Sequence, residues 1–68
     1  MKFYIKEIRQ KQRLSVRGLS KLAKVGKSTI SDTENGKRVP CLITLCKIAR
    51  ALNVDVTELF EMEEKDFE

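Results

Sequence analysis

Residues 14–40 read LSVRGLSKLAKVGKSTISDTENGKRVP, and this stretch predicts two short helices joined by a tight turn. Ser15 is a suitable N-cap for a first helix over residues 16–23. The second helix is expected to begin after Gly26 and to end at residues 35–36, because the glycine of an Asn-Gly pair adopts the left-handed C′ conformation without steric penalty. So few residues remain between the two helices that the chain must reverse its direction at once.

The Gly-Lys-Ser triplet at residues 26–28 resembles the end of a phosphate-binding loop, but its surroundings exclude that function. Such a loop needs a glycine five positions before its second glycine, and it must follow a buried strand. The residue at the earlier position is Lys21, and the pattern that precedes it is helical. Nucleotide binding is therefore rejected, and Gly26 is interpreted as the start of a helix.

The second helix of the pair has a slim apolar side. On a helical wheel, Thr29, Ile30 and Thr33 fall together, and Ile30 is the only strongly apolar residue among them. A polar helix face usually only meets water, but hydrogen-bonding side chains beside a tight turn also suit the major groove of DNA. The wheel by itself leaves both interpretations open. The polar side consists of Lys27, Ser28, Ser31 and Asp32.

Apolar residues at helical spacing predict three further helices. The first covers about residues 2–12, and the most apolar segment, CLITLCKIARAL at residues 41–52, predicts the central helix of the core. A fifth helix is expected from Asp55, because Asp55 and Glu58 have the spacing of a capping box. No alternation typical of strands interrupts the pattern, so the sequence predicts an all-α domain of about five helices. The residues expected to face the core from the central helix are Leu42, Leu45, Cys46, Ile48, Ala49 and Leu52.

Charge is distributed unevenly along the 68 residues. Residues 1–56 contain 13 basic and 4 acidic side chains, whereas the last 12 residues contain 6 acidic side chains and 1 basic side chain. A basic body indicates a polyanionic partner. We therefore divide the chain into a domain at residues 1–61 and an acidic tail at residues 62–68. For the tail, simple solubility and the docking of a protein partner are both considered.

Several classes of function are disfavoured by what the chain lacks. It has no histidine and no evident nucleophile-base pair or carboxylate pair, so an enzyme is not expected. Cys41 and Cys46 would lie about 7.5 Å apart along one helix axis, too far for a disulfide. We expect two reduced and mostly buried thiols, with no metal and no cofactor. Without a signal peptide or a membrane-spanning apolar run, a cytoplasmic protein is expected.

Together with the later LITLCKIARALNVDVTELF, the opening stretch resembles the Cro/phage-repressor helix-turn-helix family, also called the xenobiotic-response-element type. The resemblance covers about residues 5–60. It implies a compact five-helix, lambda-repressor-like domain, with the helix-turn-helix at about residues 16–35 and the recognition helix at about residues 27–34. It further implies a transcriptional regulator, with a repressor as the preferred kind. Such a regulator acts as a homodimer on the double-stranded DNA of a palindromic operator.

The base-reading positions implied by the resemblance belong to the recognition helix. Lys27 and Ser28 correspond to residues that contact base edges, and Asp32 corresponds to a second reading position. Ser31 is added from the helical wheel. A lysine donates to guanine O6 or N7, and a carboxylate accepts from cytosine N4. The family's contacts to the phosphate backbone correspond to Asn35, Lys37 and Arg38.

Three positions depart from the family pattern. Val16 stands where the family often has a glutamine, so the neighbouring Arg17 is expected to take over a phosphate contact. Lys24 replaces the usual turn glycine and needs either a left-handed backbone or another turn geometry. Thr33 replaces a larger apolar residue, which predicts a weaker anchor for the recognition helix.

Two residues match a structural feature of the family. Arg9 and Glu34 correspond to an ion pair that joins the first and third helices.

A different use of the same fold is the alternative to a DNA-binding regulator: a protein-interaction module, such as an antitoxin or adaptor, that docks through the acidic tail.

Overall fold

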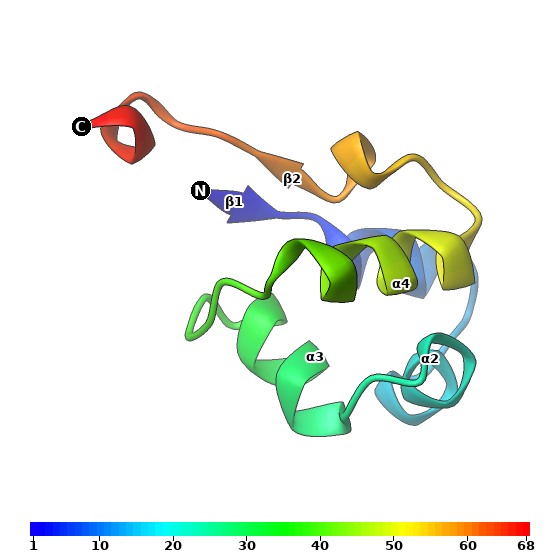
Figure 1. The fold of residues 1–68 in the computed structure, drawn as a ribbon. Helices are drawn as coiled ribbons and strands as arrows, with labels where there is room; N and C mark the ends of the chain where they lie inside the picture. Colours follow the sequence, from blue (N-terminus) through cyan, green and yellow to red (C-terminus); the bar gives the residue numbers. More distant parts are fainter.

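The computed structural model describes residues 1–68 and consists of four α-helices and a two-stranded antiparallel sheet (Figure 1). The helices are α1 (Ile5–Lys11), α2 (Val16–Ala23), α3 (Lys27–Glu34) and α4 (Leu42–Leu52). The strands are β1 (Lys2–Phe3) and β2 (Phe60–Glu61), and two short 3-10 helices are η1 (Val56–Glu58) and η2 (Glu64–Phe67).

The expected five-helix fold is wrong in its first and last elements. Lys2 pairs with Glu61 and Phe3 pairs with Phe60, so the first helix begins only at Ile5. The predicted fifth helix is the single turn η1, although its predicted capping box does form. Local periodicity cannot reveal such a sheet, because its two strands come from opposite ends of the chain and each has only two residues.

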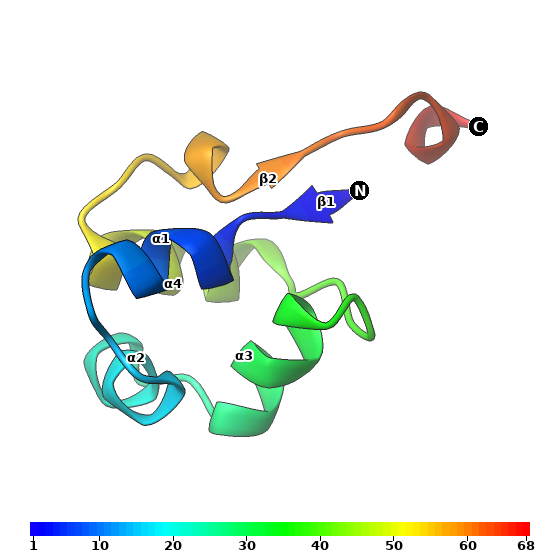
Figure 2. The ribbon, with the colours of Figure 1, turned by 180° about the vertical axis from the view of Figure 1, so that it is seen from behind.

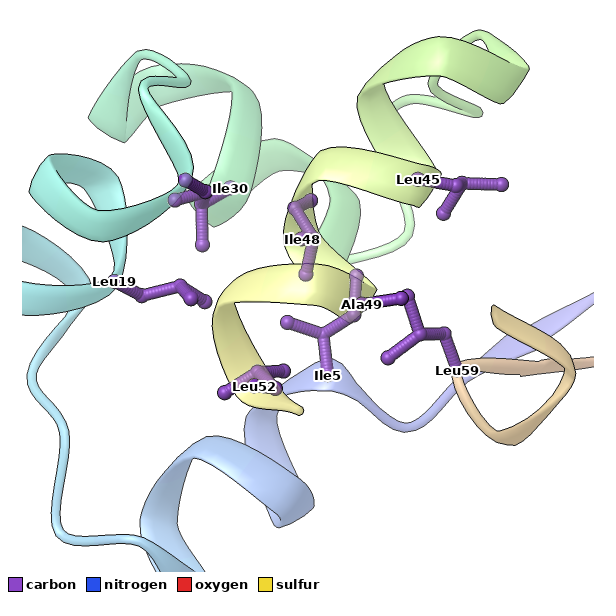
Figure 3. Close-up of a cluster of buried hydrophobic side chains, with 9 residues drawn as sticks. Ile5, Leu19, Ile30, Leu45, Ile48, Ala49, Leu52 and Leu59 are labelled. Carbon is purple, nitrogen blue, oxygen red and sulfur yellow. The ribbon is translucent and has the colours of Figure 1, made fainter. Parts of the chain in front are cut away.

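The core is a cluster of nine buried apolar residues around α4 (Figure 3). Each fully buried leucine or isoleucine contributes roughly 1.5–3 kcal/mol relative to an exposed one. One face of α4 provides four of the nine, and the other helices and η1 pack around that face. The members are Ile5, Leu19, Ala23, Ile30, Leu45, Ile48, Ala49, Leu52 and Leu59.

The sequence pattern assigned more residues of α4 to the core than the structure buries. Leu42 is 71% exposed, and Cys46 and Cys41 are exposed as well, so the expectation of mostly buried thiols is wrong. Leu22 on α2 is also exposed. The reason is geometric: neighbouring elements cover one side of each helix, and apolar residues that lie farther around the helix stay outside the core.

Beyond the helices, the sheet and η2 form an arm that extends from the helical body (Figures 1 and 2). The Met1 amino group lies 3.1 Å from Glu63 Oε1 and 2.7 Å from Asp66 Oδ2, and this ammonium lowers the pKa of both carboxyls. The molecule measures 35 × 21 × 19 Å along its principal axes. None of the helices combines the length and apolar character that crossing a membrane requires.

Candidate nucleic-acid interface

A tight turn joins α2 to α3, and side-chain hydrogen bonds and one left-handed residue fix its geometry. Ser15 accepts a hydrogen bond from the backbone N–H of Gly18 at 2.9 Å, which confirms it as the N-cap of α2. At the other end of α2, Lys24 adopts the left-handed conformation, with φ 57° and ψ 43°. This costs a residue other than glycine roughly 1–2 kcal/mol. The hydroxyl of Ser20 donates to the carbonyl of Val25 at 2.6 Å and stabilises the turn. Gly26 is the N-cap of α3, as predicted.

One side of α3 is fixed firmly in the core despite its slim apolar content. Ile30 is fully buried and Thr33 almost so. The Thr33 hydroxyl donates to the carbonyl of Thr29 at 2.8 Å, so its burial leaves no unpaired polar atom. The hydrogen bond satisfies the Thr33 hydroxyl, and Ile30 remains the one large apolar side chain of α3 in the core.

The other side of α3 carries the candidate base-reading residues, which are less buried than Ile30 and Thr33. Lys27 and Ser28 are exposed on the first turn, and Ser31 and Asp32 are half-buried on the next. From Lys27 to Asp32 this row extends about 7.5 Å along the helix axis, less than the roughly 12 Å width of the major groove of B-DNA. α3 lies at the periphery of the molecule in both views (Figures 1 and 2).

Arg9 and Glu34 form a bidentate ion pair that ties α3 to α1. Arg9 Nε donates to Glu34 Oε2 at 2.8 Å, and Arg9 Nη2 donates to Glu34 Oε1 at 3.0 Å. The third contact of the guanidinium is the carbonyl oxygen of Leu14, at 2.9 Å from Nη1. The side chains of Arg9 and Glu34 are only 10% and 6% exposed, and the hydrogen bond to Glu34 raises the pKa of Arg9 above its ordinary value. Glu34 is thus committed to structure and is not available to DNA.

The end of α3 is closed by a hydrogen-bonded cap that orients the residues after it. Gly36 has φ +73°, and its N–H donates to the carbonyl of Thr33 at 3.2 Å. The N–H of Lys37 donates to the carbonyl of Asp32 at 2.8 Å, which completes a Schellman motif. The predicted helix stop at Asn35 and Gly36 is confirmed.

Arg38 folds back over α3 and contacts two of its residues. Its Nη1 donates to the Thr29 hydroxyl at 3.0 Å, and its Nη2 lies 3.8 Å from Asp32 Oδ2. A candidate phosphate contact and a candidate base-reading residue are therefore neighbours, and Arg38 partly balances the charge of Asp32. The sequence did not single out Thr29, because its contact depends on the path of the chain after Gly36.

The remaining candidate phosphate contacts lie before and after α3 in the amino-acid sequence. Arg17 is exposed on the first turn of α2, next to Val16, which packs partly into the core. Lys37 is exposed directly after the α3 cap. The Asn35 side chain is exposed and lies 3.4 Å from the Ser31 hydroxyl. Basic and polar groups thus flank the polar row of α3 from α2 and from the segment that follows α3.

Comparison with known proteins agrees with this arrangement. The sequence profile of the helix-turn-helix family matches residues 5–59. A search of curated protein sequences finds no significant match. Among solved structures, the chain is similar to the restriction-modification controller protein C.AhdI from Aeromonas hydrophila, with 32% identity and a TM-score of 0.79, covering 82% of this chain and 85% of that one.

Two further solved structures have similar values. The N-terminal DNA binding domain of SinR from Bacillus subtilis has 30% identity and a TM-score of 0.79, with 88% of each chain covered. An HTH_3 family transcriptional regulator from Vibrio cholerae has 30% identity and a TM-score of 0.76; the match covers 79% of this chain but only 30% of that one. From the profile match over most of its length and the arrangement of α2 and α3, the chain belongs to the helix-turn-helix family of DNA-binding transcriptional regulators.

Proposed function

We propose that the protein is a cytoplasmic, non-enzymatic repressor that binds a specific sequence of double-stranded DNA with α3 in the major groove. The observation that carries this proposal is the polar row of α3, which is exposed at Lys27 and Ser28. Ile30, Thr33 and the Arg9–Glu34 pair fix the helix from behind. Lys27 donates to guanine, and Ser28 and Ser31 donate or accept at base edges. A rigid helix with short serine side chains at two of these positions orders them on DNA at a small entropic cost, whereas Lys27 loses more rotamer freedom.

Phosphate contacts supply affinity and hold α3 in register. Arg17 would contact one strand from the start of α2, and Asn35, Lys37 and Arg38 would contact the backbone beside the end of α3. Asp32 faces a polyanion, and its repulsion from DNA is reduced because Arg38 is its neighbour. If Asp32 accepts a hydrogen bond from cytosine N4, Arg38 must either stay beside Asp32 or leave it to bind a DNA phosphate.

A homodimer on a palindromic operator is the second part of the proposal. Four exposed apolar or weakly polar residues form what we call the α4 patch, from the loop before α4 and its first turns: Val39, Leu42, Ile43 and Cys46. An exposed apolar cluster of this kind is typical of an interaction site. A symmetric contact through this patch would present two recognition helices to the two half-sites of a palindromic operator.

Selection of bound sites from random duplex DNA tests the proposal. We expect one enriched sequence with two inverted half-sites, since a symmetric dimer reads the same sequence twice. Titration of the selected site at several salt concentrations should give a logarithmic slope of about −0.9 for each phosphate contact. Weak binding with no preferred sequence would contradict the repressor and would favour the protein-interaction module.

A further inference from the structure

An open pocket of about 570 Å³ lies between the C-terminal ends of α2 and α4. Three of the six residues that line it are cations, none is acidic, and the others are apolar. The pocket therefore combines positively charged and apolar side chains. Its residues are Leu22, Ala23, Lys24, Lys47, Arg50 and Ala51.

The proposed contact with DNA does not account for this pocket. Lys47 and Arg50 belong to α4, outside the α2–α3 pair and outside the segment after α3. Arg17, the candidate phosphate contact of α2, lies about 10 Å along the helix axis from Lys24 at the other end. The macrodipoles of α2 and α4 favour cations at their C-terminal ends. They do not explain why Leu22 beside these cations stays 59% exposed.

The arm carries the opposite combination of properties. Residues 61–68 contain five acidic side chains and one lysine, and they expose two large apolar side chains. Glu63 and Asp66 are paired with the Met1 ammonium of the same chain, which leaves Glu61, Glu64 and Glu68 for other contacts. Phe67 is 73% exposed and Met62 is 38% exposed. An acidic segment with an exposed aromatic ring complements a pocket lined by cations and apolar side chains in both charge and hydrophobicity.

The arm cannot reach the pocket of its own chain. Figures 1 and 2 show η2 at one end of the molecule and the C-terminal ends of α2 and α4 at the opposite end. The start of the acidic segment is held by the pairing of Phe60 with Phe3 and of Glu61 with Lys2. The segment that complements the pocket must therefore come from another molecule.

We propose that this pocket binds the acidic segment 61–68 of a second copy of the chain. Phe67 of one copy packs on Leu22 and Ala51 of the other, and the neighbouring carboxylates lie beside Lys47 and Arg50. The contact joins two different surfaces, so it is head-to-tail and leaves one free pocket and one free arm at the ends of the pair. It thereby differs from a symmetric dimer through the α4 patch.

The contact is tested by reversing the charges of the pocket in one variant and of the arm in another. Self-association of each variant, and of their mixture, is measured by sedimentation in low salt. The pocket variant carries Lys47→Glu and Arg50→Glu, and the arm variant carries Glu64→Lys and Glu68→Lys, four exposed residues without a side-chain hydrogen bond. Each variant alone should self-associate at least about tenfold more weakly than the original chain. An equimolar mixture of the two should recover association, because a reversed arm then meets a reversed pocket.

A matched control and a second measurement keep the result specific. Lys6→Glu with Lys11→Glu, on α1 and outside the pocket, makes the same change in net charge and should leave the association unchanged. A synthetic peptide of residues 60–68, added to isotope-labelled protein, should shift the NMR signals of Leu22 and Ala51. The peptide with Phe67→Ala should shift them much less.

Three outcomes would overturn the proposal: no recovery in the mixture, equal losses in the control, or no shift at Leu22 and Ala51 with millimolar peptide. Association that persists in the pocket variant but disappears with polar residues at Leu42 and Ile43 would also overturn it. That last result would leave the proposed DNA-binding homodimer intact, so the two proposals fail separately.

Discussion

Arg9 is the residue that connects most of the fold to the candidate DNA surface. Its guanidinium donates to Glu34 of α3 and to the carbonyl of Leu14, which precedes α2, so one side chain of α1 binds two other segments of the chain. Removing one partner of a buried ion pair costs more than the pair itself contributes, because the other charge is left without a partner. The position of α3 therefore depends on a residue outside the helix-turn-helix.

We predict that Arg9→Ala lowers the free energy of unfolding by about 3 kcal/mol, measured by urea denaturation. This is a large part of the stability of so small a domain. The double variant Arg9→Met, Glu34→Leu should recover most of the loss, since it removes both charges and keeps apolar volume. A loss in Arg9→Ala below about 0.5 kcal/mol would mean that the pair is largely solvated.

Lys27 is the residue on which sequence preference should depend most. We predict that Lys27→Ala weakens binding to the selected DNA site by about 10- to 100-fold and relaxes the choice at one base position. Lys21→Ala is the control, because Lys21 is also an exposed lysine but lies on α2, outside the polar row. Equal losses on selected and random DNA would show that Lys27 contacts phosphate instead of a base.

Among the elements, α3 is defined more by its two ends than by its apolar side. It begins after Gly26, two residues beyond the left-handed Lys24, and the Schellman motif at Gly36 ends it. The same cap sets the backbone path of Lys37 and Arg38. The helix that should read bases and the segment that should contact phosphates are therefore positioned by one local structure.

The cap can be tested at Gly36. An added Cβ would meet nothing within 4 Å, so the effect of Gly36→Ala comes from the left-handed backbone alone, at about 1–2 kcal/mol. We expect the midpoint of thermal unfolding to fall by roughly 5–15 °C. Gly36→Asn should lose clearly less, because asparagine tolerates this conformation. Equal losses in the two variants would show that the backbone conformation is not the cause.

At the scale of the whole molecule, the domain buries a small core and leaves apolar residues on its surface. α4 illustrates both: one face provides four core residues, and Leu42 and Ile43 remain 71% and 63% exposed. A small domain cannot cover every apolar side chain by itself. The α4 patch is available for a second copy, and the basic pocket and acidic arm offer a separate, head-to-tail contact.

We predict that Leu42→Ser with Ile43→Ser abolishes the symmetric dimer in sedimentation experiments and weakens binding to a two-half-site operator at least about tenfold. Binding to a single half-site should stay nearly unchanged, because the substituted residues lie outside the α3 row. Thermal unfolding of the variant, which should shift little at such exposed positions, is the control for folding. Unchanged operator binding would place the dimer interface elsewhere.

The sequence by itself determined the features that depend on neighbours along the chain. The N-cap at Ser15, the bounds of α2, the start of α3 at Gly26, its stop at Gly36 and the capping box at Asp55 all follow from contacts within a few residues. For the same reason, the polar row of α3 could be assigned residue by residue.

Only the tertiary structure decided what depends on residues far apart in the chain. The pairing of residues 2–3 with residues 60–61 replaced the outer turns of two predicted helices. Packing left Leu42 and Cys46 outside the core and brought Arg38 to Thr29. The basic pocket joins residues 22–24 to residues 47–51. Local spacing shows which side of a helix is apolar, but only the placement of the other elements decides which apolar residues are covered and which charges become neighbours.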